Sequence, residues 1–330
     1  MPYPLLRSAG LALLALAMAG TGFVLLQTLR RPPLEPYRNL VLPAAAKDAP
    51  LRVRFAGVST LLFDDGETAW ITDGFFSRPG KAATLLTRIA PDPAAVERGL
   101  QRLGVTRLAA VVPLHSHYDH AMDAPLVAQR SGALLVGGAS TLNVGRGLGL
   151  AEAQMREVRA GDTIELGRFK LRFLASRHSP TPWSDGVTPE TLDAPLTPPA
   201  RASAWREGDV WSLLVEHAWG RRFLVQGSAG FVPGALAGRR VDTVFLGVGT
   251  LGRKTEDYRD AYWTETVRAV GARRVIAVHW DDFWLPLDAP LQAMPLLLDD
   301  FATTMADLQE RGARDGIEVR LPPLFTPFVP

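Results

Sequence analysis

The residues that most clearly suggest chemistry are three histidines and one aspartate in a single short segment. Three of the six histidines of the chain lie in the run His115-Ser116-His117-Tyr118-Asp119-His120. In an extended stretch alternate side chains point the same way, so the rings of His115 and His117 can meet one cation. Asp119 and His120 follow where the chain turns into a helix, and they can face a second cation. Zinc accepts imidazole nitrogen and carboxylate oxygen without any thiolate, so the run predicts a metal site.

Regular elements on both sides of this run would hold it in place. Residues 106–114 (TRLAAVVPL) form a continuous apolar stretch that is typical of a buried strand. A short helix over 93–103 precedes this strand, with Pro93 at its start and Gly104 after its end. A second helix is expected over about 122–130. The histidine run should therefore lie at the end of a buried strand, at one edge of a sheet.

The rest of the body divides into two strand-rich halves. In the first half we expect strands at 51–57, 59–65, 68–74 and 132–138, then a short helix or loop over 141–150. In the second half we expect β structure over 156–176, strands at 211–219, 221–228, 242–248, 273–280 and 317–321, and helices over about 255–270 and 291–311. Residues 180–206 are a proline-rich insertion without periodicity. This order suggests an α/β sandwich of two sheets with helices outside.

The segment HSHYDH matches the HxHxDH signature of the metallo-β-lactamase superfamily, and the resemblance extends over about residues 51–330. The family also has a lone histidine at a later strand end, where this chain has His178 in LASRHSP, and a final histidine after an apolar strand, where it has His279 in RVIAVHW. The turn ITDGFFSRP, which contains Asp73, resembles the branch of phospholipase-D-type lipid phosphodiesterases and lactonase-like hydrolases. The resemblance implies an αββα sandwich with the metals at one edge of the sheets.

The same resemblance implies how the metal ligands divide. His115, His117 and His178 would form one zinc site, and Asp119, His120 and His279 the other. Asp73 would accept an N–H from a ligand imidazole. Most of the superfamily has an aspartate that bridges both metals at the position where this chain has Ser228. Ser228 either donates a hydrogen bond to a hydroxide shared by two zincs or marks a site that holds one zinc.

The implied activity is zinc-dependent hydrolysis by a metal-bound hydroxide that Asp119 orients. An amphiphilic ester or phosphodiester is the expected substrate. The alternatives are a lactonase or β-lactamase-like amidase and a metal-binding scaffold without turnover. Trp183, Trp280 and Phe283 lie near the ligand histidines in sequence and are candidates for apolar pocket walls, or for core packing. Asp281 and Asp282 either bind a polar substrate group or cap the next segment.

Composition excludes several other classes of protein. The chain of 330 residues has 36 Lys and Arg against 34 Asp and Glu, and the excess of positive charge lies in the first fifty residues. A nucleic-acid groove, which needs a basic surface, is not expected. The absence of cysteine excludes disulfides, iron–sulfur clusters and thiol nucleophiles. The glycine run from Gly247 to Gly252 is expected at the rim of the site rather than in a dinucleotide turn, and His217 is expected to be an ordinary strand residue.

The N-terminal end predicts a membrane segment. Residues 8–29 carry no charge and would measure about 33 Å as a helix, enough to cross a bilayer core. An uncleaved anchor is our prediction, and a signal peptide cleaved after Ala17-Met18-Ala19 is the alternative. The expected domains are an anchor at 1–30, a proline-rich tether at 31–50 and the hydrolase at 51–330. Arg30 and Arg31 favour a cytoplasmic body, whereas the signal-like start favours a body exported across a bacterial inner membrane.

Overall fold

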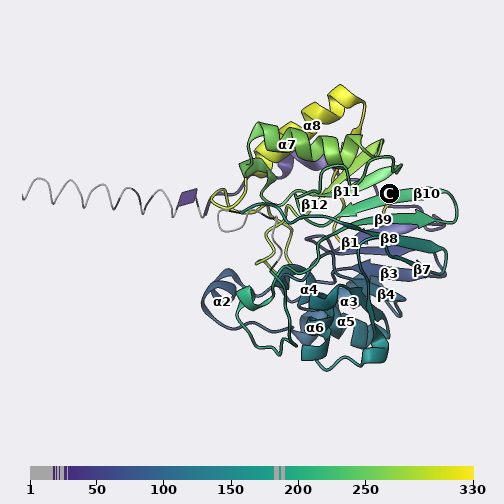
Figure 1. Ribbon diagram of the computed structural model, residues 1–330. Helices are drawn as coiled ribbons and strands as arrows, with labels where there is room; N and C mark the ends of the chain where they lie inside the picture. The colour runs from purple at the N-terminus through teal and green to yellow at the C-terminus, as the bar shows by residue number, and fades with distance from the viewer. Residues whose placement is uncertain are drawn as a thin grey trace, which may run out of the picture.

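The computed structural model describes residues 18, 20, 22, 26, 27, 29–181, 186 and 190–330. Two mixed sheets lie face to face, and helices cover both outer faces (Figure 1). The predicted αββα sandwich is therefore confirmed. The predicted anchor lies mostly outside the described residues. None of the described helices combines the length and apolar character that a membrane span requires.

The first sheet has six strands in the order β1-β2-β3-β4-β5-β6. Their bounds are β1 Arg52–Phe55, β2 Leu61–Asp64, β3 Ala69–Thr72, β4 Ala110–Val112, β5 Leu134–Gly137 and β6 Met155–Glu157. The pairs β1–β2 and β2–β3 are antiparallel, and the strands from β3 to β6 run parallel. The carboxyl ends of β3, β4 and β5 consequently meet at one edge of this sheet.

The second sheet has seven strands in the order β13-β12-β11-β10-β9-β8-β7. Their bounds are β7 Thr163–Leu166, β8 Phe169–Ala175, β9 Trp211–His217, β10 Arg221–Gln226, β11 Thr243–Gly247, β12 Arg274–Val278 and β13 Glu318–Arg320. The strands from β10 to β13 run parallel, whereas β9 is antiparallel to both of its neighbours, β8 and β10. In β8 buried and exposed residues alternate through most of the strand, as expected for a strand with one face in the core.

The helices form the two outer layers, which Figure 1 shows above and below the sheets. Their bounds are α2 Lys81–Leu86, α3 Pro93–Leu103, α4 Tyr118–Ala121, α5 Ala124–Ser131, α6 Ala139–Gly147, α7 Glu256–Trp263 and α8 Phe301–Asp315. A π-helical turn, Thr264–Arg268, continues α7. Helices α3 and α5 pack on the first sheet, and α7 and α8 pack on the second. A third apolar layer, which includes Phe63, Phe169 and Phe223, fills the space between the sheets.

Two sequence predictions about the fold are wrong. The last helix begins at Phe301 rather than near residue 291. Pro295 disfavours helix in the residue before it, and Ala293 forms a β-bridge with Asp281. The Asp300 side chain then accepts a hydrogen bond from the Thr303 N–H and begins the helix.

Residues 31–50 are not an extended tether. They contain a short 3₁₀ helix, Glu35–Leu40, and the buried residue Leu42. The Tyr37 ring meets Phe301 edge-on at 5.3 Å, and the Leu42 N–H donates to the Leu321 carbonyl at 2.9 Å. Because these apolar side chains find partners at the other end of the chain, the segment packs against the body.

Candidate metal centre

All six candidate ligands follow strand ends at one edge of the two sheets. His115 and His117 lie in the loop after β4, and Asp119 and His120 lie in α4, the single helical turn that follows. His178 comes from the loop after β8, and His279 follows β12 directly. Both sheets therefore contribute to one site, as the family resemblance implies.

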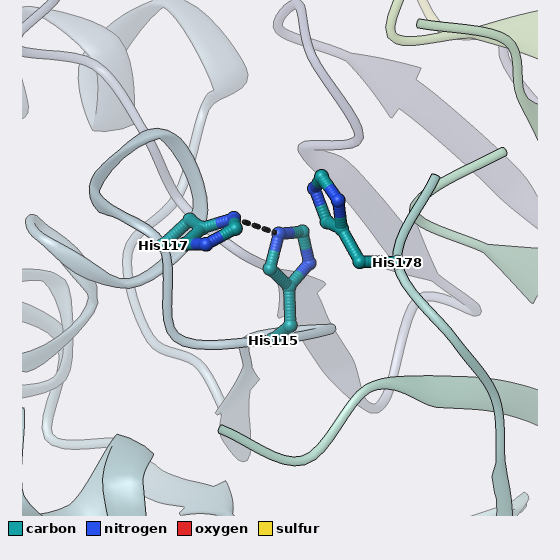
Figure 2. A group of neighbouring side chains, drawn as sticks. All are labelled: His115, His117 and His178. Atoms are coloured by element: carbon teal, nitrogen blue, oxygen red, sulfur yellow. Dashed lines mark hydrogen bonds between the residues drawn. The ribbon is translucent and has the colours of Figure 1, made fainter. Parts of the chain in front are cut away.

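The first ligand cluster is His115, His117 and His178. One ring nitrogen of each lies within 4.8 Å of the others. Nε2 of His115 is 3.1 Å from Nδ1 of His117. Figure 2 shows the His115 ring between the other two, with all three rings turned toward one another. Nδ1 of His178 is 2.8 Å from the Ser179 carbonyl oxygen, to which it can only donate, so Nε2 of His178 is left as the metal ligand.

The second cluster is Asp119, His120 and His279, whose ligand atoms also lie within 4.8 Å of one another. Nε2 of His120 and Nε2 of His279 are 3.2 Å apart. Oδ2 of Asp119 lies 3.4 Å from His279 Nε2 and 3.6 Å from His120 Nε2. The two clusters adjoin, because the ring centroids of His115 and His120 are only 3.8 Å apart.

Burial and mutual repulsion keep the first cluster uncharged. Burial lowers the pKa of His117 to about 4 and that of His178 to about 3. Burial, together with the neighbouring histidines, also holds the pKa of His115 well below its usual range. Burial opposes ionisation of Asp119, yet His120 and His279 hold its pKa below the usual range. At neutral pH the three imidazoles of the first cluster are therefore neutral and Asp119 is a carboxylate, the forms that bind a metal.

Asp73, at the end of β3, holds His120 as the sequence predicts for an outer carboxylate. Oδ2 of Asp73 lies 2.9 Å from Nδ1 of His120 and also accepts the Ser59 hydroxyl at 2.6 Å. Oδ1 accepts the Leu114 N–H at 2.9 Å, and this bond fixes the backbone directly before His115. Because a carboxylate can only accept here, Nδ1 of His120 donates and Nε2 faces the metal. Asp73 has a φ of 53°, a left-handed conformation that is uncommon outside glycine.

His279 is held by a loop from the first sheet. It has a φ of 61°, and its N–H donates to the Val58 carbonyl at 2.6 Å. On the other side lies the predicted glycine loop, where a Cβ at Gly249 would come within 3.0 Å of His279 Nδ1. The glycine run therefore packs against the ligand His279, and a side chain at position 249 would crowd the His279 ring.

Ser228 turns toward the first cluster. Its hydroxyl oxygen accepts the Ser179 N–H at 2.9 Å, next to His178. Ser228 is almost fully buried. It therefore fixes the backbone that carries His178, a role that the sequence analysis did not consider for this position.

The structure corrects three of the five candidates for the substrate pocket. Trp280 is buried against Phe301 on the α8 side of the sheet. Asp281 is buried in an ion pair with Arg78, with 2.6 Å between charged atoms, and its other oxygen accepts the Val58 N–H at 2.8 Å. Asp282 is buried, pairs with Arg31 and accepts the Trp284 N–H at 2.9 Å, which is the capping role that the sequence left open. The side chains of Trp280, Asp281 and Asp282 are buried and occupied by contacts within the protein, so they are not free to bind a substrate.

The other two candidates have different outcomes. Phe283 lies at the site, with its ring 5.7 Å from the His279 ring and 6.2 Å from the Tyr118 ring. Trp183 lies outside the described residues. His217 is remote from both clusters and pairs with Asp65, with 3.0 Å between Nε2 and Oδ2.

Sequence reasoning missed three residues that support the centre: Ser59, Arg78 and Tyr118. Arg78 follows the apolar residues Phe75 and Phe76, and a lone cation in such a run is a signal for a buried pair. Nothing in the sequence marks Ser59 or Tyr118 as a supporting residue, although Tyr118 lies inside the HSHYDH run.

Comparisons with known proteins agree with this geometry. The sequence profile of a family described as a beta-lactamase superfamily domain matches residues 72–280, a range that contains all six ligand candidates. No match is found among curated proteins. Igni18, a metallo hydrolase from the hyperthermophilic archaeon Ignicoccus hospitalis, is similar in structure with a TM-score of 0.51 and 13% identity, over 82% of this chain and 94% of that chain.

Two further solved structures show weaker similarity. The metallo-beta-lactamase fold protein YhfI from Bacillus subtilis has a TM-score of 0.47 and 13% identity, over 82% of this chain and 95% of that one. CmlA, a diiron beta-hydroxylase from Streptomyces venezuelae, has a TM-score of 0.49 and 14% identity, over 86% of this chain and 54% of that one. With its αββα sandwich, its two ligand clusters and the profile match across most of the body, this chain belongs to the beta-lactamase superfamily and has the metal-dependent hydrolase fold of that family.

Proposed function

We propose that this protein is a membrane-anchored, zinc-dependent hydrolase of an amphiphilic ester or phosphodiester. The observation that carries the proposal is the pair of adjoining clusters, each with three ligands, at one edge of the sandwich. Five imidazoles and one carboxylate, without sulfur, are a donor set that suits zinc. Nε2 of His115 lies 3.1 Å from Nδ1 of His117, so this nitrogen faces the first cluster.

When bound, divalent cations at this site would polarise the carbonyl or phosphoryl oxygen of the substrate and lower the pKa of water. The protein contributes position and charge. Asp73 and Ser179 fix the tautomers of His120 and His178, so the metal-facing nitrogens keep their lone pairs. Oδ2 of Asp119 faces the second cluster, and the free lone pairs of this carboxylate can accept a hydrogen bond that orients the attacking water.

An amphiphilic substrate is supported by the rim of the centre. Phe283 and Tyr118, both half-buried, continue the ring contacts that begin at His279, and the buried Phe75 packs edge-on against Tyr118. Such a wall suits an acyl or other apolar group next to the bond that is hydrolysed. Anchoring is supported by the uncharged residues 8–29, and we propose a bacterial inner membrane with the body exported. Retention of the full chain in the membrane pellet after a carbonate wash would support an anchor, whereas a soluble mature protein beginning at Gly20 would support a cleaved signal.

The reaction is tested on the full chain after chelation and reloading with zinc. The substrates are a model phosphodiester, a long-chain ester, a lactone and a chromogenic β-lactam, and their relative rates separate the proposed reaction from a lactonase or amidase. His117→Ala should abolish metal-dependent hydrolysis and retain the fold. His217→Ala is the matched control, because His217 is also a buried histidine but lies outside the centre. Full activity in the exhaustively chelated protein, or metal binding without turnover on any substrate, would refute the proposal.

A further inference from the structure

Three exposed leucines lie on α2 and on the segment that follows His279. The described residues include nine large hydrophobic side chains that are exposed: Met18, Leu26, Leu29, Val41, Leu85, Leu86, Trp219, Leu297 and Val329. Leu85 and Leu86, the last two residues of α2, are 58% and 75% exposed. Single exposed apolar residues are ordinary, but two consecutive leucines on a helix beside a proposed active centre need a partner.

Helix α2 borders the metal centre through Trp284. The Lys81 ammonium, in the first turn of α2, lies 5.5 Å from the centroid of the Trp284 ring. The Trp284 indole N–H donates to the Tyr118 hydroxyl at 3.1 Å, and Tyr118 directly precedes the ligand Asp119. The only buried residue of α2 is Thr84. Leu85 and Leu86 therefore lie on the solvent side of the rim.

The N-terminal region reaches the same rim from the other side. The Leu297 N–H donates to the Gln27 carbonyl at 3.2 Å, and the Leu296 N–H donates to the Arg30 carbonyl at 2.9 Å. Arg31 pairs with Asp282, which is close in sequence to Trp284. The segment after His279 is thus bordered by α2 and by the residues that follow the uncharged run. Figure 1 shows α2 and the first described residues at the same end of the molecule.

We infer that this end, formed by Leu85, Leu86 and Leu297, is a surface that rests on a lipid bilayer and holds the metal centre against it. The inference rests on the proposed membrane location and deepens it, because it explains how an amphiphilic substrate would reach the ligands without leaving the membrane. A bilayer can contact the separate leucines together because it is planar and wide.

The charges and aromatic side chain at this end suit a bilayer with anionic lipids. Arg30 and Arg88 are exposed, and Lys81 is half-buried next to Trp284. Tryptophan beside a cation is typical of the membrane interface, and lysine and arginine near an anionic surface add attraction. Leucine side chains next to this tryptophan and these cations would insert at the boundary between the lipid headgroups and the acyl chains.

The absence of cysteine makes the surface straightforward to test by labelling. We suggest full-length variants Leu85→Cys, Leu297→Cys and Trp219→Cys, each with an environment-sensitive fluorophore, in vesicles of phosphatidylcholine and phosphatidylglycerol. Trp219→Cys is the matched control. Trp219 is 47% exposed, and it lies in the β9–β10 turn, at the opposite edge of the sheet from His279. Labels at positions 85 and 297 should be quenched by spin-labelled lipids, and the label at position 219 should not.

A second variant links the surface to catalysis. Leu85→Glu combined with Leu86→Glu should lower the rate on a substrate presented in vesicles by about tenfold or more, because the apolar burial of two leucines is lost. The rate on a short water-soluble ester should stay within about twofold, because neither leucine belongs to the centre.

Three outcomes would overturn the inference: a chain that stays off the vesicles, labels at positions 85 and 297 that remain as water-exposed as the label at 219, or labels that are already shielded without lipid. The last outcome would indicate a protein partner or a second copy of the chain. Lipid quenching without hydrolysis of any substrate would leave the surface intact and refute only the proposed reaction.

Discussion

Nδ1 of His120 lies 2.9 Å from Oδ2 of Asp73, a carboxylate in a different part of the first sheet. Neither side chain is accessible to solvent. Their contact decides which nitrogen of His120 carries the proton, and therefore which nitrogen is left for a metal. A long-range contact between two strand ends thus controls the chemistry of a ligand that the sequence places inside one short run.

Asp73→Asn should weaken zinc binding at the second cluster by about 10- to 100-fold. The asparagine amide can present an N–H to His120, and the ring would then move its proton to Nε2, the atom that faces His279. Calorimetric titration of the chelated protein should show one weakened step. The matched control is Asp65→Asn, which removes a buried Asp–His pair remote from the centre. If both variants bind two zincs with wild-type affinity, the proposed role of Asp73 is wrong.

Asp281→Asn should lower the free energy of unfolding by about 3–5 kcal/mol, because it leaves the guanidinium of Arg78 buried without a counter-charge. Neither side chain of the pair is accessible to solvent. Arg78→Met combined with Asp281→Asn removes both charges and should restore part of the loss. Denaturant unfolding of the three proteins under identical zinc conditions gives these values. Equal stability of the single and double variants would argue against a charge effect.

Ser228→Ala should loosen His178, because the buried Ser179 N–H loses its acceptor, at a cost of about 1–3 kcal/mol. Ser228→Asp retains an acceptor and adds a negative charge, so it should raise the affinity for the second metal and lower turnover by making the metals weaker Lewis acids. Denaturant unfolding measures the cost of Ser228→Ala, and native mass spectrometry during zinc titration together with the hydrolysis rate measures the effects of Ser228→Asp. A wild type that never exceeds one zinc, together with undiminished activity in Asp119→Asn, would show that the second cluster is not used.

Asp123 should make the stability of the protein fall as the pH rises from about 4 to 6. Its carboxylate accepts the N–H groups of Phe76 and Ser77 and the Ser77 hydroxyl. Burial raises the pKa of Asp123 from 3.8 to about 6. In this window the folded chain therefore binds more protons than the unfolded chain, and protonation favours folding; above about pH 6 the effect is complete.

Asp123→Asn should remove this part of the pH dependence, because an amide does not titrate; its oxygen can still accept the Phe76 and Ser77 N–H groups, and its NH2 can donate to the Ser77 hydroxyl oxygen. The difference in unfolding free energy between the two proteins should change by up to about 1.4 kcal/mol per pH unit in the window and level off outside it. Urea unfolding of both chelated proteins between pH 4 and 8 measures this difference. Parallel pH profiles for the two proteins would show that Asp123 does not titrate in this range.

The sequence by itself determined the features that depend on near neighbours. The apolar strand β4 and the turn that follows it lie beside each other in the chain, so the spacing within HSHYDH was enough to predict that these side chains meet. The order of apolar strands and helices suggested a sandwich of two sheets with helices outside, and the αββα fold itself came from the resemblance to a known family. His178 and His279 could be assigned only through the resemblance to a known family, because nothing local marks them as partners of that run.

Only the tertiary structure decided where the residues after His279 point. Side chains alternate along a strand, but His279 has a φ of 61°, which breaks that alternation. Trp280 therefore packs under α8 and Asp281 meets Arg78, although their place next to a ligand favoured a substrate pocket. The prediction of a tether at residues 31–50 was wrong for a similar reason. A proline-rich segment can be a tether or part of the body, and contacts with Phe301 and Leu321, distant in the chain, made it part of the body.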